Sequence, residues 1–464
     1  MEKLFWAVLL AVIPFIASCI LLHPAASVNP QAAQERDLIA ASQAGALPVF
    51  FNPDEATVPL ITPGNFIDSQ ECLVRDGLPN FFQKAVAGGR ITIGYIGGSI
   101  TRGKGMYRNQ SAKFIHHLFP STQMKAINAG VAGTGTDLGA CRIREQLLTY
   151  HPDLIFIEFA VNGAFRPGME GMVRQIWNFD PHIDICFLYT IHGNQWQTYA
   201  AGVVPDNIQG LEAIADYYHI PSVHMGLAPS IMAQNGRLSW KASAPADTGE
   251  LAFSKDGVHP LKAGGNLYAQ AIARAMIKMK KADPPLRASI HQLPAPLLVN
   301  NWEDAKMLDP RTTATFSPGW QVVDPLKKDS LRTFAPWFPY IMQSGIPGAS
   351  FTFRFKGTMV GLFDIGGPEA GQLRLIVDGQ EKKRINRFNR YCDDRYRGQC
   401  TFVRLSPGLH SVTFEISEAK VDKARILGAG RSDDIIRHPK RYQQTVEWLG
   451  KILIRGTLMP AATP

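Results

Sequence analysis

Short apolar runs separated by amphipathic stretches fill the chain from about residue 70 to residue 280. The runs are rich in β-branched and aromatic residues and predict strands, and the stretches between them repeat apolar residues at helical spacing. Strands that alternate with helices indicate a mainly parallel sheet covered on both faces, a three-layer α/β/α fold of the flavodoxin-like kind. The predicted strands are 91–96, 124–128, 154–159, 183–189 and 220–224, and the predicted helices are 79–87, 137–150, 169–178, 207–218 and 263–280.

After Asp283-Pro284-Pro285 the pattern changes to alternating apolar and polar residues. A period of two is typical of half-buried strands, and Asp378-Gly379 and Pro407-Gly408 are typical of hairpin turns. Residues 286–464 are therefore predicted to form an antiparallel β-sandwich. Its predicted strands are 350–355, 358–363, 371–378, 400–405, 410–416 and 451–456.

The N-terminal region has a different pattern from either domain. Residues 5–22 are apolar apart from Ser18, and Lys3 precedes them, so residues 1–27 are predicted to be an export leader. The protein is thus expected outside the cytoplasm, as a periplasmic, secreted or membrane-anchored protein whose only membrane contact is this segment. Cleavage near Ala25-Ala26-Ser27, lipidation at Cys19 and retention as an uncleaved anchor remain open. Residues 28–65 lack periodicity and are expected to be a linker or wrapping segment, which leaves 66–283 for the α/β domain.

Composition narrows the class of protein. The 464 residues suggest two or three domains, and a content of 45% hydrophobic and 19% charged residues excludes a largely disordered chain. A multi-pass membrane protein is excluded because only one apolar run is long enough to span a bilayer. Five cysteines lie beyond the leader; Cys186 is expected in the core, and a disulfide between Cys392 and Cys400 is left open. No cysteine pair has zinc-ligand spacing, and no metal site or cofactor is predicted.

The net charge of +9 is unevenly distributed. Residues 1–285 contain 22 Lys and Arg against 22 Asp and Glu, whereas residues 286–464 contain 26 against 17. Basic residues interleaved with aromatic ones gather over 382–397. Export argues against nucleic acid as a partner. A solvated hairpin face is the simpler interpretation of this segment, and an anionic glycan is the partner expected if the segment binds a ligand.

Two polar motifs carry candidate chemistry. Gly97-Gly98-Ser99 follows a predicted strand, which places the serine at the carboxyl edge of the sheet, where ligands of such folds bind. Asp256 and His259 lie three residues apart in one loop. A histidine there can offer one ring nitrogen to a serine while the aspartate orients the ring, which is what a serine nucleophile requires.

Two further loops follow neighbouring strands. The backbone N–H of Gly133 and the side-chain amide of Asn162 can both stabilise a developing oxyanion. Glu158, inside the apolar strand before Asn162, needs a partner, and a structural ion pair with Arg142 or Arg102 is expected. Trp196 and Tyr199 follow the fourth strand and line a substrate pocket or simply pack.

Taken together, these four elements resemble the SGNH (GDSL-type) hydrolase superfamily in its Gly-Gly-Ser-Ile-Thr variant. Its four conserved blocks supply Ser, Gly, Asn and His in an order matched here by Ser99, Gly133, Asn162 and His259. The variant also carries an arginine in the helix after the second block, matched by Arg142. One departure is Asn162-Gly163, where the superfamily usually has Asn-Asp.

The resemblance implies a serine esterase that needs no cofactor. Ser99 would form the acyl-enzyme, with His259 and Asp256 as base and orienter, and the N–H groups of Ser99 and Gly133 would join Asn162 in the oxyanion hole. Acetyl esters on a poly- or oligosaccharide are the expected substrates. An O-acetyltransferase that uses the same acyl-enzyme and a non-catalytic glycan-binding envelope protein are the alternatives.

Overall fold

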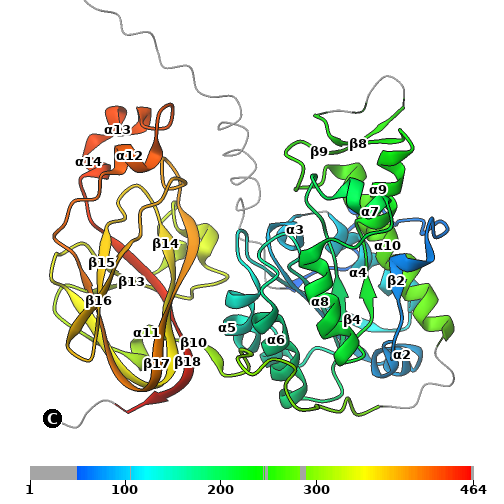
Figure 1. The fold of residues 1–464 in the computed structure, drawn as a ribbon, viewed down its shortest axis with the longest axis horizontal. Helices are drawn as coiled ribbons and strands as arrows, with labels where there is room; N and C mark the ends of the chain where they lie inside the picture. Colours follow the sequence, from blue (N-terminus) through cyan, green and yellow to red (C-terminus); the bar gives the residue numbers. More distant parts are fainter. Residues whose placement is uncertain (1–49, 105, 244, 246–248, 283–288, 461–464) are drawn as a thin grey trace, which may run out of the picture.

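A computed structural model describes residues 50–460, except residues 105, 244, 246–248 and 283–288. The predicted leader with Cys19, residues 28–49 and the boundary at Asp283-Pro284-Pro285 lie outside these ranges. Within them, no helix is both long enough and apolar enough to cross a bilayer. Two domains lie side by side in Figure 1, and we call them the first and second domain in chain order.

A seven-stranded sheet with the order β1-β4-β3-β5-β6-β7-β2 forms the centre of the first domain. The five central strands run parallel, and the two-residue edge strands β1 and β2 run antiparallel to their neighbours. The strands are β1 (Phe50–Phe51), β2 (Cys72–Leu73), β3 (Arg90–Gly97), β4 (Gln123–Gly130), β5 (Leu154–Glu158), β6 (Asp184–Leu188) and β7 (Ser222–Val223).

Helices cover both faces of this sheet, which confirms the predicted three-layer fold (Figure 1). Parallel crossovers are right-handed, so connections that step in opposite directions along the sheet place their helices on opposite faces. Accordingly α5, α6 and α8 pack side by side, whereas α4 packs on α10. A small separate sheet consists of the two strands β8 (Leu238–Lys241) and β9 (Leu251–Ser254). The helices are α2 (Pro79–Val86), α3 (Ser99–Arg102), α4 (Tyr107–Leu118), α5 (Thr136–Gln146), α6 (Arg166–Phe179), α7 (Trp196–Ala200), α8 (Asp206–Tyr217), α9 (Leu227–Gln234) and α10 (Lys262–Ala282).

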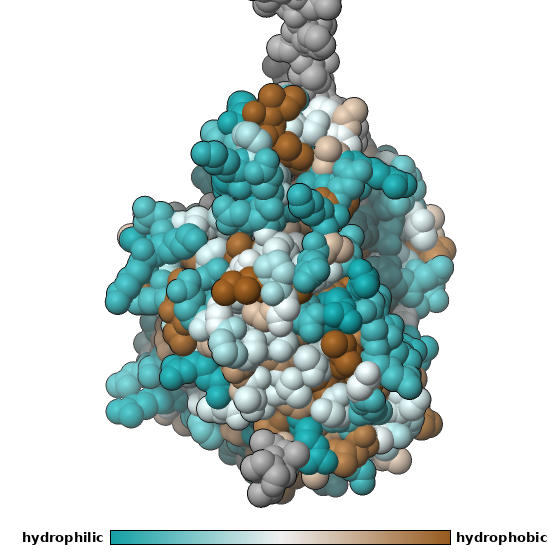
Figure 2. All heavy atoms as spheres, turned by 90° about the vertical axis from the view of Figure 1, so that its left-hand side faces the viewer, coloured by the Kyte–Doolittle hydropathy of each residue, from teal (hydrophilic) through white to brown (hydrophobic). Residues whose placement is uncertain are grey.

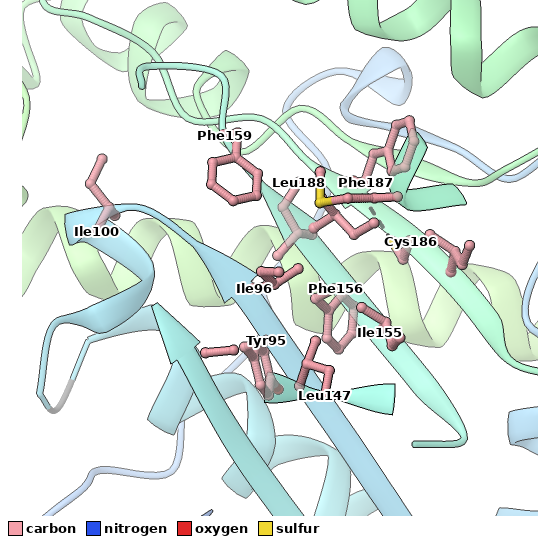
Figure 3. Packing of buried hydrophobic residues seen from close by; sticks show 14 of the residues in the cluster. Tyr95, Ile96, Ile100, Leu147, Ile155, Phe156, Phe159, Cys186, Phe187 and Leu188 are labelled. Atoms are coloured by element: carbon pink, nitrogen blue, oxygen red, sulfur yellow. Dashed lines mark hydrogen bonds between the residues drawn. The ribbon is translucent and has the colours of Figure 1, made fainter. Parts of the chain in front are cut away.

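The core of the first domain lies on both sides of the central strands. Figure 3 shows Tyr95, Phe156 and Cys186 on adjacent strands, with Tyr95 and Phe156 stacked at a centroid distance of 5.0 Å. All three side chains are at most 1% exposed. Central strands buried on both faces account for the continuous apolar runs in the sequence, and the predicted core position of Cys186 is confirmed.

Part of the predicted linker belongs to the first domain. Phe50 and Phe51 form an edge strand on β4, and Val58 and Ile61 are buried. Lys113 in α4 donates hydrogen bonds to the carbonyl oxygens of Glu55 and Val58. Residues 50–65 therefore wrap the first domain, in agreement with the wrapping alternative for this stretch, whereas residues 28–49 lie outside the described residues.

The second domain is a curled antiparallel sheet of nine strands. Its path is β12-β13-β18-β14-β17-β15-β16, with β10 paired to β18 and β11 paired to β14. Because β14, β17 and β18 are long, one sheet folds over to enclose a core of phenylalanine and aliphatic side chains. The strands are β10 (Ala305–Leu308), β11 (Thr315–Phe316), β12 (Gln321–Val323), β13 (Ile341–Ser344), β14 (Ser350–Gly366), β15 (Gln372–Val377), β16 (Gln380–Asn386), β17 (Arg397–Ile416) and β18 (Glu447–Met459).

The two predicted hairpin turns have different outcomes. Asp378 and Gly379 join β15 to β16 with φ angles of 53° and 81°, as a tight turn requires. Pro407-Gly408, however, lies inside the continuous strand β17, where the register against β14 shifts. A strand proline is tolerated at such a bulge because the ladder of hydrogen bonds is already interrupted there.

Cys392 and Cys400 carry free thiols, so no disulfide joins them. Cys392 is buried next to Gly366, and burial raises its pKa to about 11. The pKa of Cys400 is likewise raised by burial, to about 12. Both side chains therefore act as small packing residues in their neutral form.

The two domains share an interface on the side of α5 and α6 (Figure 1). The Nζ atom of Lys451, a side chain only 5% exposed, lies 2.7 Å from a carboxylate oxygen of Glu145 in α5. The ring of Trp302 contacts Phe402 at a centroid distance of 5.3 Å. Trp302, Phe338 and Phe363 belong to the same continuous buried cluster as the core of the first domain.

The opposite side of the second domain is hydrophilic. Figure 2 shows this face mostly covered by polar residues, with hydrophobic residues as separate spots. Exposed hydrophobic residues of this domain include Ile346, Leu409 and Ile436. Such scattered residues are normal for a surface in water.

Candidate active site

Three parallel strands bring the candidate residues to one edge of the sheet. Gly97 at the end of β3 is in register with Gly130 of β4 and with Glu158 of β5. The chain then leaves each strand into the segment that carries Ser99, Gly133 or Asn162. Val131 N–H donates to the carbonyl oxygen of Gly97, which ties the loop after β4 to the end of β3.

Ser99, His259 and Asp256 form a continuous chain of hydrogen bonds. Ser99 Oγ lies 2.7 Å from His259 Nε2, and His259 Nδ1 lies 2.7 Å from Asp256 Oδ2. Ser99 is 7% exposed and begins the short helix α3. An ionised Asp256 can only accept, so Nδ1 carries the proton and Nε2 is left to accept the hydroxyl proton of Ser99.

The second carboxylate oxygen of Asp256 fixes its own loop. Oδ1 accepts hydrogen bonds from Ser254 Oγ at 2.8 Å and from the backbone N–H groups of Val258 and His259 at 2.9 Å. Burial alone would raise the pKa of Asp256, but these donors and the His259 ring outweigh burial and hold the pKa well below its usual range. The carboxylate therefore stays charged and keeps the imidazole oriented.

Asn162 lies against the backbone next to Ser99. A Cβ atom on Gly98 would be only 2.2 Å from Asn162 Oδ1, so any side chain at position 98 would displace this amide. Gly163 has a φ of 73°, a left-handed conformation that favours glycine. The departure from the usual Asn-Asp pair thus has a local backbone reason.

Replacing Asn162 by alanine should lower kcat for an aryl acetate by about 100- to 1,000-fold, or ~2.7–4 kcal/mol, with little change in KM. The amide is expected to stabilise charge that develops only in the transition state. Steady-state kinetics on the two proteins measure this loss. Asn194→Ala is the matched control. Asn194 has the same side chain and lines the adjacent groove, but it is not a candidate oxyanion donor. A loss below tenfold at position 162 would remove Asn162 from the oxyanion hole.

Arg142 supports the strand ends. It is fully buried in α5 and donates hydrogen bonds to the carbonyl oxygens of Ala129, one residue before the end of β4, and of Gly97, the last residue of β3. Burial lowers its pKa to about 9, still above neutrality. The guanidinium therefore holds the loops of Gly133 and Ser99 at a fixed separation.

The expected ion pair of Glu158 is absent among the described residues. Its carboxylate instead accepts hydrogen bonds from the hydroxyls of Thr101 and Thr190, at 2.8 and 2.5 Å. Burial raises its pKa, and the two hydroxyls oppose that shift. Two neutral donors thus take the place of the expected arginine as partners of the buried carboxylate. One of them, Thr101, links Glu158 to the helix that begins with Ser99.

An open groove of about 890 Å³ begins beside Asp256 and is lined by His192, Trp196 and Trp240. A second hollow of about 510 Å³ shares His192 with the groove and reaches Gly163. Tyr199 is instead buried and hydrogen-bonded to His224, so only Trp196 of the two predicted aromatic residues lines this surface. Trp240 was not predicted from the sequence to lie at the groove, because its short strand β8 follows no clear hydrophobic pattern.

The second domain also reaches this edge. Nη2 of Arg397, the first residue of β17, lies 2.9 Å from the place where a Cβ atom on Gly133 would be. Gly133 has a φ of 70° and carries no side chain between its backbone and the guanidinium. Arg397 was not singled out in the sequence, because no local pattern shows which residue of a distant domain meets the site.

No three His, Cys, Asp or Glu side chains gather as metal ligands within the described ranges.

The sequence matches no protein-family model and no curated relative. Among solved structures, the chain is similar to a two-domain esterase (CEX) active on acetylated mannans, with 21% identity, a TM-score of 0.65, and coverage of 84% of this chain and 97% of that one. The same esterase crystallised with mannopentaose matches at 21% identity with a TM-score of 0.61, covering 82% and 94% of the two chains. An acetylxylan esterase from Geobacillus stearothermophilus covers 40% of this chain and 94% of its own at 17% identity, with a TM-score of 0.32.

The likeness to the two-domain esterase extends over both domains. It confirms the predicted fold, a three-layer α/β/α domain followed by an antiparallel β domain.

Proposed function

We propose that the protein is a serine esterase that removes acetyl groups from a carbohydrate through an acyl-enzyme at Ser99. The observation that carries the proposal is the chain of two 2.7 Å hydrogen bonds from Ser99 through His259 to Asp256, placed at the carboxyl edge of the sheet. This arrangement supplies a nucleophile, a base and an orienter in the order that acyl transfer needs.

The reaction follows from the proton positions in this chain. Ser99 Oγ attacks the ester carbonyl as its proton passes to His259 Nε2, and the resulting oxyanion is stabilised by the N–H groups of Ser99 and Gly133 and by Asn162. His259 then returns the proton to the sugar oxygen that leaves, and an acetyl group remains on Ser99. Water, deprotonated by His259, attacks this ester, which releases acetate and restores the serine.

Support for a carbohydrate substrate comes from the surroundings of the site. The groove beside Asp256 is open along its length and presents Trp196, whose flat ring suits the face of a sugar ring, whereas Trp240 is buried against Phe253 and forms the groove wall. The similar two-domain esterase is active on acetylated mannans, which makes acetylated polysaccharides the first substrates to try.

We place the enzyme outside the cytoplasm, because residues 5–22 form an apolar run typical of an export leader. We also assign the binding of anionic glycan to the second domain, which holds the whole charge excess. The basic segment 382–397 is not one continuous surface, however. Arg387 is buried against Asp364, and Arg384 pairs with Glu381, whereas Lys382 and Lys383 are exposed.

Acetate release from an aryl acetate, acetylated mannan and acetylated xylan tests the function. We expect release from the aryl ester and from at least one polysaccharide, and we expect an aryl butyrate to react more slowly. Acetyl transfer to added sugar that outpaces hydrolysis would make the protein an O-acetyltransferase. Retention on a glycan without any turnover would make it a binding protein.

A further inference from the structure

A cation from the second domain lies at the candidate oxyanion loop. The nearest approach is between Arg397 Nη2 and Gly133, the glycine proposed to donate its N–H to the oxyanion. Arg397 opens β17, which is paired to β14 from Gly366↔Arg397 onward. Because a sheet register fixes its backbone, the guanidinium is presented to the loop by a rigid element.

Arg397 makes no ion pair with an Asp or Glu of the described chain. The ring of Tyr391 lies 4.6 Å from the guanidinium carbon, and the Nε atom of Arg397 is buried without a hydrogen-bond partner. Burial lowers the pKa of Arg397, and the neighbouring charge of Arg390 also lowers it. A partly buried guanidinium without an acidic partner has donors to offer to a ligand.

Two further arginines lie beside the aromatic ring that Arg397 contacts. The guanidinium groups of Arg390 and Arg431 also lie near the Tyr391 ring, at 4.7 and 5.9 Å. Arg397 therefore lies in an arginine-rich cluster around Tyr391, at the β4 end of the sheet edge. The groove lined by Trp196 and Trp240 lies on the side of β6, so a linear substrate across Ser99 would meet both.

We propose that Arg397 is a specificity-determining residue that binds the carboxylate of an acidic sugar next to the acetylated one, so that the preferred substrate is an acetylated polyuronate. This inference rests on the proposed esterase function and deepens it. A planar guanidinium binds a carboxylate through two parallel hydrogen bonds, which a neutral sugar cannot reproduce. The second domain would thus select the substrate inside the active site rather than by its outer surface.

Acetylated polymannuronate and acetylated mannan provide a matched test, because their sugars differ in the carboxylate at C6. We expect wild-type kcat/KM to be at least tenfold higher on the acidic polymer, through a lower KM. Arg397→Met should raise KM on that polymer by about 10- to 100-fold and leave the mannan and an aryl acetate within about twofold. Arg404→Met is the control, since Arg404 lies on the same strand and is exposed.

Folding and catalysis are separated by two further measurements. Thermal unfolding checks Arg397→Met, and Arg397→Lys should restore only part of the affinity, because it keeps the charge but loses the planar fork. Calorimetric binding of polymannuronate to Ser99→Ala, with and without Arg397→Met, should differ by about tenfold or more. This readout needs no turnover, so it tests Arg397 even if the esterase function fails.

Three results would overturn the inference. The first is an equal kcat/KM of the wild type on both polymers. The second is an equal loss of kcat/KM in Arg397→Met on both polymers and on the aryl acetate. The third is unchanged binding of polymannuronate when Arg397 is replaced. The second result would show that the guanidinium only positions the Gly133 loop.

Discussion

Replacement of Ser99 by alanine should reduce kcat for an aryl acetate by about 10⁴-fold or more. The substitution removes the only atom that can carry the acetyl group in the proposed mechanism, while the groove and the oxyanion donors remain. KM should change little, because binding of the substrate does not depend on the hydroxyl. Steady-state kinetics, together with labelling by a fluorophosphonate, measure the effect.

Ser239→Ala is the matched control for this experiment. Ser239 lies in β8 and lines the groove beside Asp256 without entering the hydrogen-bonded chain, so its loss should leave kcat within about threefold. Turnover in Ser99→Ala above about one hundredth of the wild-type rate would rule out the acyl-enzyme at this residue. Thermal unfolding of both variants excludes misfolding as the cause of any loss.

Asp256→Asn should reduce kcat by about 10⁴-fold at neutral pH. An amide can keep one oxygen toward the Ser254 hydroxyl and the backbone donors of Val258 and His259. Its NH₂ group would then face His259 Nδ1 and donate to it. The imidazole proton would move to Nε2, which could no longer accept the proton of Ser99.

Ser254→Ala distinguishes this effect from a general loosening of the loop. It removes one hydrogen bond to Asp256 Oδ1 but leaves the contact between Oδ2 and Nδ1, so we expect a loss of about tenfold at most. Equal losses in the two variants would mean that Asp256 acts as a loop anchor rather than as the orienter of His259.

Much of the site could be predicted because it depends on local chain order. Ser99, Gly133 and Asn162 each follow the end of a parallel strand, and parallel strands end at one edge whatever the details of packing. Asp256 and His259 are three residues apart, so their contact is nearly local. For these reasons, sequence alone placed the five residues in one site.

The features that escaped prediction depend on tertiary contacts. The partners of Glu158 are hydroxyls from α3 and from the loop after β6, and a sequence does not distinguish them from the basic residues nearby. Arg397 meets Gly133 only because the domains pack together. The strand β17 continues past Pro407 because a bulge interrupts its pairing with β14 at that point. Local turn propensity does not reveal such a bulge.

The buried cluster that contains Trp302, Phe338 and Phe363 together with the core of the first domain has a consequence for evolution. Accessory domains joined by exposed linkers can be exchanged between genes as independent cassettes. Here such an exchange would leave apolar residues of the first domain uncovered and would remove Arg397 from beside Gly133. The two halves of this gene are therefore expected to be inherited together, with their substitutions correlated across the domain boundary.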